Sequence, residues 1–231
     1  MKHKIITIEN HHESEFASHL CIESSNKVNN NFDIEIYDAV TPENVQSELT
    51  KENIKWTYPE VLVRDFKSGL LLHPYVTANK QARIACGVSH YKLWKECYES
   101  NEPYLILEHD AQFIRKLDYQ YILDSNYDII GLNDPRGATR NSRLFYETVI
   151  SSSNNILPVP NVDNFEVPQG LAGNSAYIIK PNGAKKLLDA VLYYGLWPND
   201  CIMCKQLISR MGVTKQFYTN VQKMEKSTTR D

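Results

Sequence analysis

The chain has 231 residues, of which 42% are hydrophobic and 23% are charged, and its formal net charge is −3. These values are close to those of ordinary globular proteins, so they exclude an intrinsically disordered or fibrous chain. The mild negative charge excludes a protein whose whole surface attracts nucleic acid, although a local basic patch stays compatible with it.

Targeting and redox features are sparse. The first apolar run stops at Glu9, which is too early for a signal peptide or a membrane span, and no other stretch approaches about 18 apolar residues. The chain has five cysteines, an odd number, and three of them fall in patterns typical of buried helices. These features predict reduced thiols in a soluble, cytoplasmic protein without an integral membrane segment.

The first part of the chain alternates strand and helix patterns. Residues 5–8 predict a buried strand, and Phe16 and Leu20 recur at helical spacing in the segment that follows. Residues 32–40 alternate in polarity and predict a second strand. The proline-containing stretch 42–80 has little periodicity, so we expect irregular structure with short helical turns.

The middle of the chain has the clearest pattern. Two apolar stripes over residues 83–99 predict a largely buried helix, and the continuous apolar run 104–107 predicts a central strand. Another strand is expected at 127–132. The polar stretch 133–169 follows, and a segment of that length without structure of its own is typical of a functional lid or variable loop.

The last third predicts a strand at 175–180, a helix at 184–192, and a final helix from 198 through 211. There is no internal repeat and no linker composition. We therefore predict one α/β domain over residues 1–231, with a mostly parallel, twisted central sheet flanked by helices.

Two carboxylates follow the best-defined strand directly. Glu108 and Asp110 are two positions apart, so an extended backbone would aim both to the same side. The carboxyl ends of strands in α/β sheets are where ligands bind. Two hard oxygen ligands there suit Mn²⁺ or Mg²⁺, which bridges the oxygens of a diphosphate. A solvated turn is the alternative interpretation of this pair.

The surrounding segments resemble glycosyltransferase family 25. They are RIACGVSHYKLW at 83–94 and YLILEHDAQF at 104–113. The family has a Gly-Cys-x-x-Ser-His-x-x-Leu-Trp helix and then an apolar strand ending in Glu-Asp-Asp. DIIGL at 128–132, GNSAYIIKPNGAKKLL at 173–188 and PND at 198–200 continue the likeness in the family's order. The family includes bacterial lipooligosaccharide and collagen galactosyltransferases.

This resemblance implies a GT-A-type fold and transfer of a hexose or pentose from a nucleotide-sugar donor to a hydroxyl acceptor, favouring a surface-glycan saccharide. It also implies roles for particular residues. Those expected at the site are Asp200 as catalytic base, Glu9, Arg83, Ser89, His90, Gly173 and Asn174 at the donor, and Glu108 and Asp110 at Mn²⁺ or Mg²⁺. A carboxylate such as Asp200 is suited to remove the proton of the attacking hydroxyl, and it could equally act as a helix cap.

Two positions depart from the family pattern. Cys86 and Gly87 stand in the reverse of the family's Gly-Cys order, and His109 replaces the middle acid of the triplet. The first change affects a packing site of small residues. The second leaves an acid-x-acid pair, so we still expect a cation at Glu108 and Asp110, with His109 pointing away from it.

Two other functions stay open. Phage-type sugar transfer onto hydroxylated bases of DNA would suit a short enzyme without a membrane anchor. The phosphate contacts would then come from cationic residues in the long loop and the tail, namely Arg136, Arg140, Arg143, Lys223, Lys226 and Arg230. The other possibility is a non-catalytic module that binds nucleotide sugars or glycans after losing its metal site through the change at His109.

Overall fold

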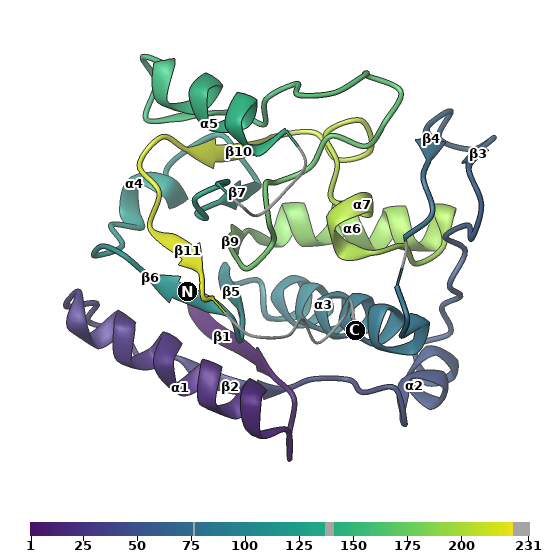
Figure 1. Ribbon diagram of the computed structural model, residues 1–231, viewed down its shortest axis with the longest axis horizontal. Helices are drawn as coiled ribbons and strands as arrows, with labels where there is room; N and C mark the ends of the chain where they lie inside the picture. Colours follow the sequence, from purple (N-terminus) through teal and green to yellow (C-terminus); the bar gives the residue numbers. More distant parts are fainter. Residues whose placement is uncertain (76, 137–140, 224–231) are drawn as a thin grey trace.

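A computed structural model describes residues 1–75, 77–136 and 141–223 (Figure 1). Its helices are α1 (His12–Lys27), α2 (Val45–Lys51), α3 (Lys80–Ser100), α4 (Gln120–Leu123), α5 (Ser142–Ser151), α6 (Pro181–Tyr194) and α7 (Asn199–Ile202). Its strands are β1 (Lys2–Thr7), β2 (Glu35–Asp38), β3 (Val63–Arg64), β4 (Leu71–Leu72), β5 (Tyr104–Glu108), β6 (Ala111–Phe113), β7 (Ile129–Gly131), β8 (Ile156–Pro158), β9 (Ala176–Ile179), β10 (Met211–Thr214) and β11 (Thr219–Val221).

Seven of the described strands form the central sheet, in the order β2-β1-β5-β9-β7-β10-β8. The pairs β1–β2, β1–β5 and β7–β10 are parallel. The pairs β5–β9, β7–β9 and β8–β10 are antiparallel. The predicted α/β sheet flanked by helices is confirmed. Strands β2, β1, β5, β7 and β10 run in the same direction, as a mostly parallel sheet requires, while β9 and β8 run in the opposite direction.

The sheet is buried on both faces. Along β5, Tyr104 and Ile106 pack into one apolar cluster with α3 and α6, while Leu105 and Leu107 pack into a second cluster that includes Cys21 of α1. All four strand residues are essentially inaccessible to solvent. This two-sided burial explains why the sequence shows a continuous apolar run here, and it fixes β5 as the rigid centre of the molecule.

Helix α3 brings its middle turns beside the end of β5. Asn79 caps its first turn by accepting a hydrogen bond from the backbone amide of Ala82 at 2.9 Å. Asn101 ends the helix in the left-handed conformation, with φ of 52°. The chain then turns directly into β5. The strands predicted around residues 5–8, 104–107, 127–132 and 175–180 and the helices predicted at 83–99 and 184–192 are all present.

Three details of the sequence-based prediction are wrong. The stretch 133–169 contains α5 and β8, and the final helix ends with α7 after four residues, so that β10 begins at Met211. The short strands β6 and β11, which pair with each other, were not expected. The helix expected around Phe16 and Leu20 is present as α1, where Phe16 is 58% exposed because α1 packs on the sheet through small residues such as Ala17 and Ser18.

Candidate functional site

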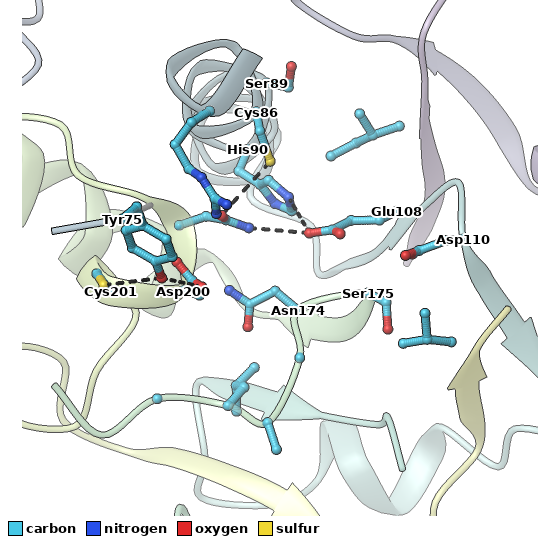
Figure 2. A pocket seen from close by; sticks show the side chains of 18 of the residues that line it. Tyr75, Cys86, Ser89, His90, Glu108, Asp110, Asn174, Ser175, Asp200 and Cys201 are labelled. Carbon is cyan, nitrogen blue, oxygen red and sulfur yellow. Dashed lines mark hydrogen bonds and ion pairs between the residues drawn. The ribbon is translucent and has the colours of Figure 1, made fainter. Parts of the chain in front are cut away.

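Three neighbouring parallel strands end at one pocket. The carboxyl ends of β2, β1 and β5 lie at the same edge of the sheet, and a pocket of about 650 Å³ opens there. Its other walls come from α3, from the segment 167–175 that leads into β9, and from α7 (Figure 2). The position is the one that the general rule for open α/β sheets predicts.

The pocket gathers most of the residues singled out from the sequence. Those that line it are Arg83, Ser89, His90, Glu108, Asp110, Gly173, Asn174 and Asp200. Glu9 is the exception: it is exposed in the turn after β1, and Ile6 and Ile8 line the pocket in its place. His109 also lines the pocket, and the orientation of its side chain away from a cation at Glu108 and Asp110 stays a prediction.

Glu108 is held by two side chains. Its Oε1 accepts hydrogen bonds from His90 Nε2 at 3.1 Å and from Asn199 Nδ2 at 3.3 Å. Burial by itself raises the pKa of Glu108, but the hydrogen bonds from His90 and Asn199 and the nearby imidazoles of His90 and His109 together outweigh burial and leave this pKa below its ordinary value. Both contacts are to Oε1, and the side chain is 28% exposed, so the carboxylate keeps one end toward the pocket.

A buried chain of hydrogen bonds leads to Glu108. Trp94 Nε1 donates to the Tyr177 hydroxyl at 2.8 Å, and this hydroxyl lies 2.8 Å from His90 Nδ1. If Tyr177 donates to Nδ1, the proton of the imidazole lies on Nε2 and is given to Glu108, so that every donor finds an acceptor. In this arrangement His90 orients Glu108. Tyr177 was missed because in sequence it is one apolar-strand residue among others.

Asp110 has an unusual environment for a carboxylate. The residue is half-buried, and its Oδ1 is a buried atom without a hydrogen-bond partner. Burial first, and the nearby negative charge of Glu108 second, raise the pKa of Asp110 to about 7. A cation beside the two carboxylates would remove both penalties. Two hard oxygen donors of this kind fit Mn²⁺ or Mg²⁺.

Asp200 lies across the pocket from Glu108, in the short helix α7 (Figure 2). Its Oδ2 accepts a hydrogen bond of 2.5 Å from the Tyr75 hydroxyl, and its buried Oδ1 has no partner. The Arg83 guanidinium lies 4.2 Å from the centroid of the Tyr75 ring. Burial raises the pKa of Asp200, whereas Tyr75 and Arg83 oppose this shift. Tyr75 was missed because it lies in a segment without periodicity.

The segment before β9 approaches α7 very closely. A Cβ at Gly170 would stand 2.9 Å from the backbone oxygen of Asp200 and 2.7 Å from that of Met203, so only glycine fits there. Gly173 has a φ of +77°, which also favours glycine. These two positions seat the segment against the helix that carries Asp200, and they leave Asn174 Oδ1 buried without a partner.

Ser89 uses its hydroxyl within the protein. The hydroxyl donates to the Ala85 carbonyl at 2.9 Å and accepts from the Val40 amide at 2.8 Å. These contacts tie α3 to the chain that leaves β2. The structure therefore gives Ser89 a role in shaping the wall of the pocket.

The loop that carries Asp110 is fixed by the end of the described chain. The backbone N–H of Gln222 donates a hydrogen bond to the backbone carbonyl of Asp110 at 2.7 Å. The side-chain Nε2 of Gln222 donates to the backbone carbonyls of Ala111 and Ala17, both at 2.9 Å. Strand β11 pairs with β6 immediately before this residue. Nothing in the sequence indicated that residues 219–222 would meet residues 109–111.

Unpartnered polar atoms are concentrated in this pocket. Among the described residues, seven buried side-chain nitrogen or oxygen atoms have no hydrogen-bond partner. Five of them belong to residues that line the pocket, namely Arg83 Nε, Asp110 Oδ1, Asn174 Oδ1, Ser175 Oγ and Asp200 Oδ1. Buried polar groups are normally satisfied, so such a cluster indicates the place of a polar ligand.

Of the cationic residues considered for phosphate contacts, the three that the structure describes, Arg136, Arg143 and Lys223, are outside the pocket lining. Arg136 forms an ion pair of 2.6 Å with Asp134, and Arg143 forms one of 2.7 Å with Glu147. Lys223 is exposed. Arg140, Lys226 and Arg230 lie outside the described residues. None of the helices within the described ranges combines the length and the apolar character needed to cross a membrane.

Comparisons with known proteins give one sequence match and several structural similarities. The family described as glycosyltransferase family 25 (LPS biosynthesis protein) matches residues 8–203. No curated protein matches the sequence significantly. The galactosyltransferase LgtC in complex with donor and acceptor sugar analogs is similar over 97% of this chain and 88% of its own, at 9% identity and a TM-score of 0.46. The apo form of mouse xyloside xylosyltransferase 1 is similar over 89% and 80%, at 8% identity and a TM-score of 0.39.

Proposed function

The chain belongs to glycosyltransferase family 25. We therefore propose that its pocket binds a nucleotide-sugar donor and that the sugar of this donor is transferred to a hydroxyl of a saccharide acceptor. Sugar transfer itself follows from the family. The donor and acceptor classes are our proposal, as are the roles of individual residues. A cytoplasmic location also stays a prediction from the sequence.

One observation supports the pocket as the donor site above the others: the five unpartnered polar atoms that line it. A nucleotide sugar carries hydroxyl and phosphate groups that can serve both donors and acceptors. Arg83 can give a hydrogen bond to a phosphate, and Asn174 can accept one from a sugar hydroxyl. The ends of β1 and β2, with Ile6, Ile8 and Val40, supply an apolar wall suited to a base.

The proposed cation is Mn²⁺ or Mg²⁺, held by Glu108 and Asp110. When bound, it supplies positive charge against the diphosphate that leaves with the nucleotide. The protein prepares this site, because the hydrogen bonds from His90 and Asn199 keep Glu108 ionised and in one orientation. The unpaired Oδ1 of Asp110 is the second ligand.

Asp200 is the proposed base. Its unpartnered Oδ1 is free to accept the proton of an acceptor hydroxyl while the oxygen of that hydroxyl attacks the anomeric carbon. Burial raises the pKa of Asp200, which strengthens it as a base. Tyr75 holds the other oxygen, so the carboxylate is presented to the acceptor in a fixed orientation.

The decisive experiment compares wild type with Asp110→Ala in donor hydrolysis and transfer, with Mn²⁺ and Mg²⁺ and a panel of nucleotide sugars. We expect metal-dependent turnover and thermal stabilisation of the wild type by at least one donor. Loss of one of two metal ligands should reduce turnover at least about 100-fold, since even an outer-shell partner is worth about 10- to 100-fold. Unchanged turnover would remove Asp110 from the mechanism. A wild type that a donor stabilises without turnover would support a non-catalytic binding module, and a wild type that no donor stabilises would contradict the proposed donor site.

A saccharide acceptor is favoured over DNA because both arginines described in the long loop are paired with carboxylates. The test is binding of a DNA duplex at low and moderate salt. Phosphate contacts weaken steeply as salt rises, so a steep salt dependence would favour DNA. We expect no binding that depends on salt in this way.

A further inference from the structure

Glu108 also belongs to a second group of side chains whose atoms could bind a metal ion. Cys86 Sγ, a ring nitrogen of His90 and a carboxylate oxygen of Glu108 all lie within 4.8 Å of one another (Figure 2). In the described ranges of the chain, this is the group of three that lies close enough to hold a metal ion. Asp110 does not belong to it. The cluster is therefore distinct in composition from the pair of carboxylates discussed above.

Local structure explains how the sulfur reaches this place. Cys86 and His90 are four residues apart in α3, so they share one face of the helix. A side chain at Gly87 would instead meet the backbone oxygen of Trp197, at 3.3 Å from its Cβ. Counted back from Ser89 and His90, Cys86 stands at the cysteine of the family's Gly-Cys-x-x-Ser-His pattern, so the expectation of a reversed order is wrong and Ala85 is the residue that departs from it. In the structure Cys86 is partly exposed in the pocket, while the other four cysteines are buried.

We propose that Cys86, His90 and Glu108 form a binding site for a thiophilic divalent cation of the Zn²⁺ type. Zinc bound by sulfur, nitrogen and oxygen at about 2.0 to 2.3 Å places its tetrahedral ligands roughly 3.3 to 3.8 Å apart. His90 Nε2 and Glu108 Oε1 are already 3.1 Å apart, so only small side-chain movements complete the site. Pocket solvent takes the fourth position, as in open zinc sites.

The surroundings of the three ligands suit this role. The Tyr177 hydroxyl can accept from His90 Nδ1 and so fix the ring with Nε2 toward the cation, which is the usual outer-shell arrangement of a metal-bound histidine. Asn199 Nδ2 donates to Glu108 and so holds the third ligand, while its Oδ1 accepts from the Cys86 thiol, a contact that ends when the thiol loses its proton. Binding replaces the thiol proton by the cation, and the proton passes to solvent.

The two cation sites share Glu108 and differ in softness. Sulfur and imidazole select Zn²⁺ and related ions, whereas the carboxylate pair selects Mn²⁺ or Mg²⁺. A cation at the thiol site neutralises the charge of Glu108 and repels a second divalent cation at the carboxylate pair. We therefore expect Zn²⁺ to compete with Mn²⁺ and to act as a reversible inhibitor that a chelator removes.

The test uses Co²⁺ as a spectroscopic substitute for Zn²⁺ on the full chain, freed of metals and kept reduced. Wild type should develop the near-ultraviolet charge-transfer band of a cobalt thiolate together with the strong visible bands of tetrahedral cobalt, and Zn²⁺ should bleach both. Cys86→Ser should abolish the charge-transfer band and weaken Co²⁺ binding at least about 100-fold, more than the loss of an outer-shell partner.

Asp110→Asn is the matched control, because it changes the carboxylate pair and leaves all three thiol-site ligands in place. It should lose Mn²⁺ binding and keep the cobalt thiolate band. Cys86→Ala serves as a second variant, and the thermal unfolding of each variant shows whether it is folded. The absence of the band in wild type, or its persistence in both folded Cys86 variants, would overturn the proposal without touching the proposed sugar transfer.

Discussion

At the scale of single residues, Asp200 and Glu108 illustrate two ways of preparing a carboxylate. Glu108 receives its hydrogen bonds from His90 and Asn199, and its pKa is lowered. Asp200 receives one hydrogen bond from Tyr75 and keeps a buried, unpartnered oxygen, and its pKa is raised. One carboxylate is thus kept ionised for a cation, and the other is set up to take a proton.

Replacing Tyr75 tests this division of roles. Tyr75→Phe removes the hydrogen bond to Asp200 Oδ2 but keeps the ring beneath Arg83. A hydrogen bond to a charged group is worth about 1.5 to 3 kcal/mol, so we expect kcat to fall roughly 10- to 100-fold with little change in the KM for the donor. Loss of a donor to the ionised form raises the pKa of Asp200, so the acidic limb of the pH–rate profile should move to higher pH.

Tyr58→Phe is the control for this variant. The Tyr58 hydroxyl donates to the His73 carbonyl at 2.8 Å and lies beside Cys201, but it has no hydrogen bond to Asp200. In Tyr58→Phe the acidic limb of the pH–rate profile should lie at the same pH as in wild type. If the two variants move the limb equally, Tyr75 acts through general packing and does not position Asp200.

At the scale of elements, the end of the described chain fixes the proposed cation loop. Gln222→Ala removes the side-chain hydrogen bonds to the carbonyls of Ala111 and Ala17. Leaving buried carbonyls unpaired costs about 1 to 3 kcal/mol, which lowers Tm by roughly 2 to 4 °C per kcal/mol in a chain of this size. Because the same loop carries Asp110, the affinity for Mn²⁺ should fall as well.

The measurements for this prediction are a thermal melt and a Mn²⁺ titration. Gln216→Ala is the matched control, since Gln216 is exposed and precedes β11. A melt that shifts without a change in Mn²⁺ affinity would mean that β11 stabilises the fold but does not position Asp110.

The elements that sequence patterns predict well are those buried on both sides or along a stripe. Helix α3 and strand β5 carry strong apolar patterns, and both are where the sequence places them. Strands β6 and β11 have three residues each and exist because they pair across more than 100 positions of the chain. Periodicity in a short window contains no information about such a partner. The direction of β9 is hidden for the same reason.

Site residues likewise divide into those that a local sequence pattern indicates and those that depend on a distant contact. Glu108, Asp110, His90 and Asp200 could be picked out because a carboxylate after a strand or a polar side chain within a recurring motif is visible in the sequence. Tyr75, Tyr177 and Gln222 could not, since each acts through a contact with a residue at least 80 positions away. Glu9 was expected at the donor only because of the weakest part of the resemblance, and it lies outside the pocket lining.

At the scale of the whole molecule, one histidine links stability to pH. His3 of β1 stacks on Phe32 at 4.2 Å between ring centroids, and its Nδ1 lies 3.2 Å from the Asp33 carbonyl. Its Nε2 is buried without a partner, so protonation would place charge where nothing accepts it. Burial lowers the pKa of His3 below 6.5, while the hydrogen bond to Asp33 opposes this only in part.

The sign of the effect follows from proton linkage. Between the lowered pKa and 6.5 the unfolded chain binds more protons at His3 than the folded chain does, so the free energy of unfolding falls as the pH drops through this window. The ring is only half-buried, so solvent screening keeps this loss small. Above pH 6.5 the contribution of His3 to stability is complete.

His3→Phe keeps the stack on Phe32 and removes the titration. Urea unfolding at several pH values from 7.5 down to about 5 should show a smaller loss of unfolding free energy in this variant than in wild type. His19→Gln provides the comparison, because His19 is exposed on α1. If both variants flatten the profile equally, the slope comes from histidine titration in general. If neither does, β1 tolerates a charged His3, and the edge of the sheet around Phe32 is more open to water than its packing indicates.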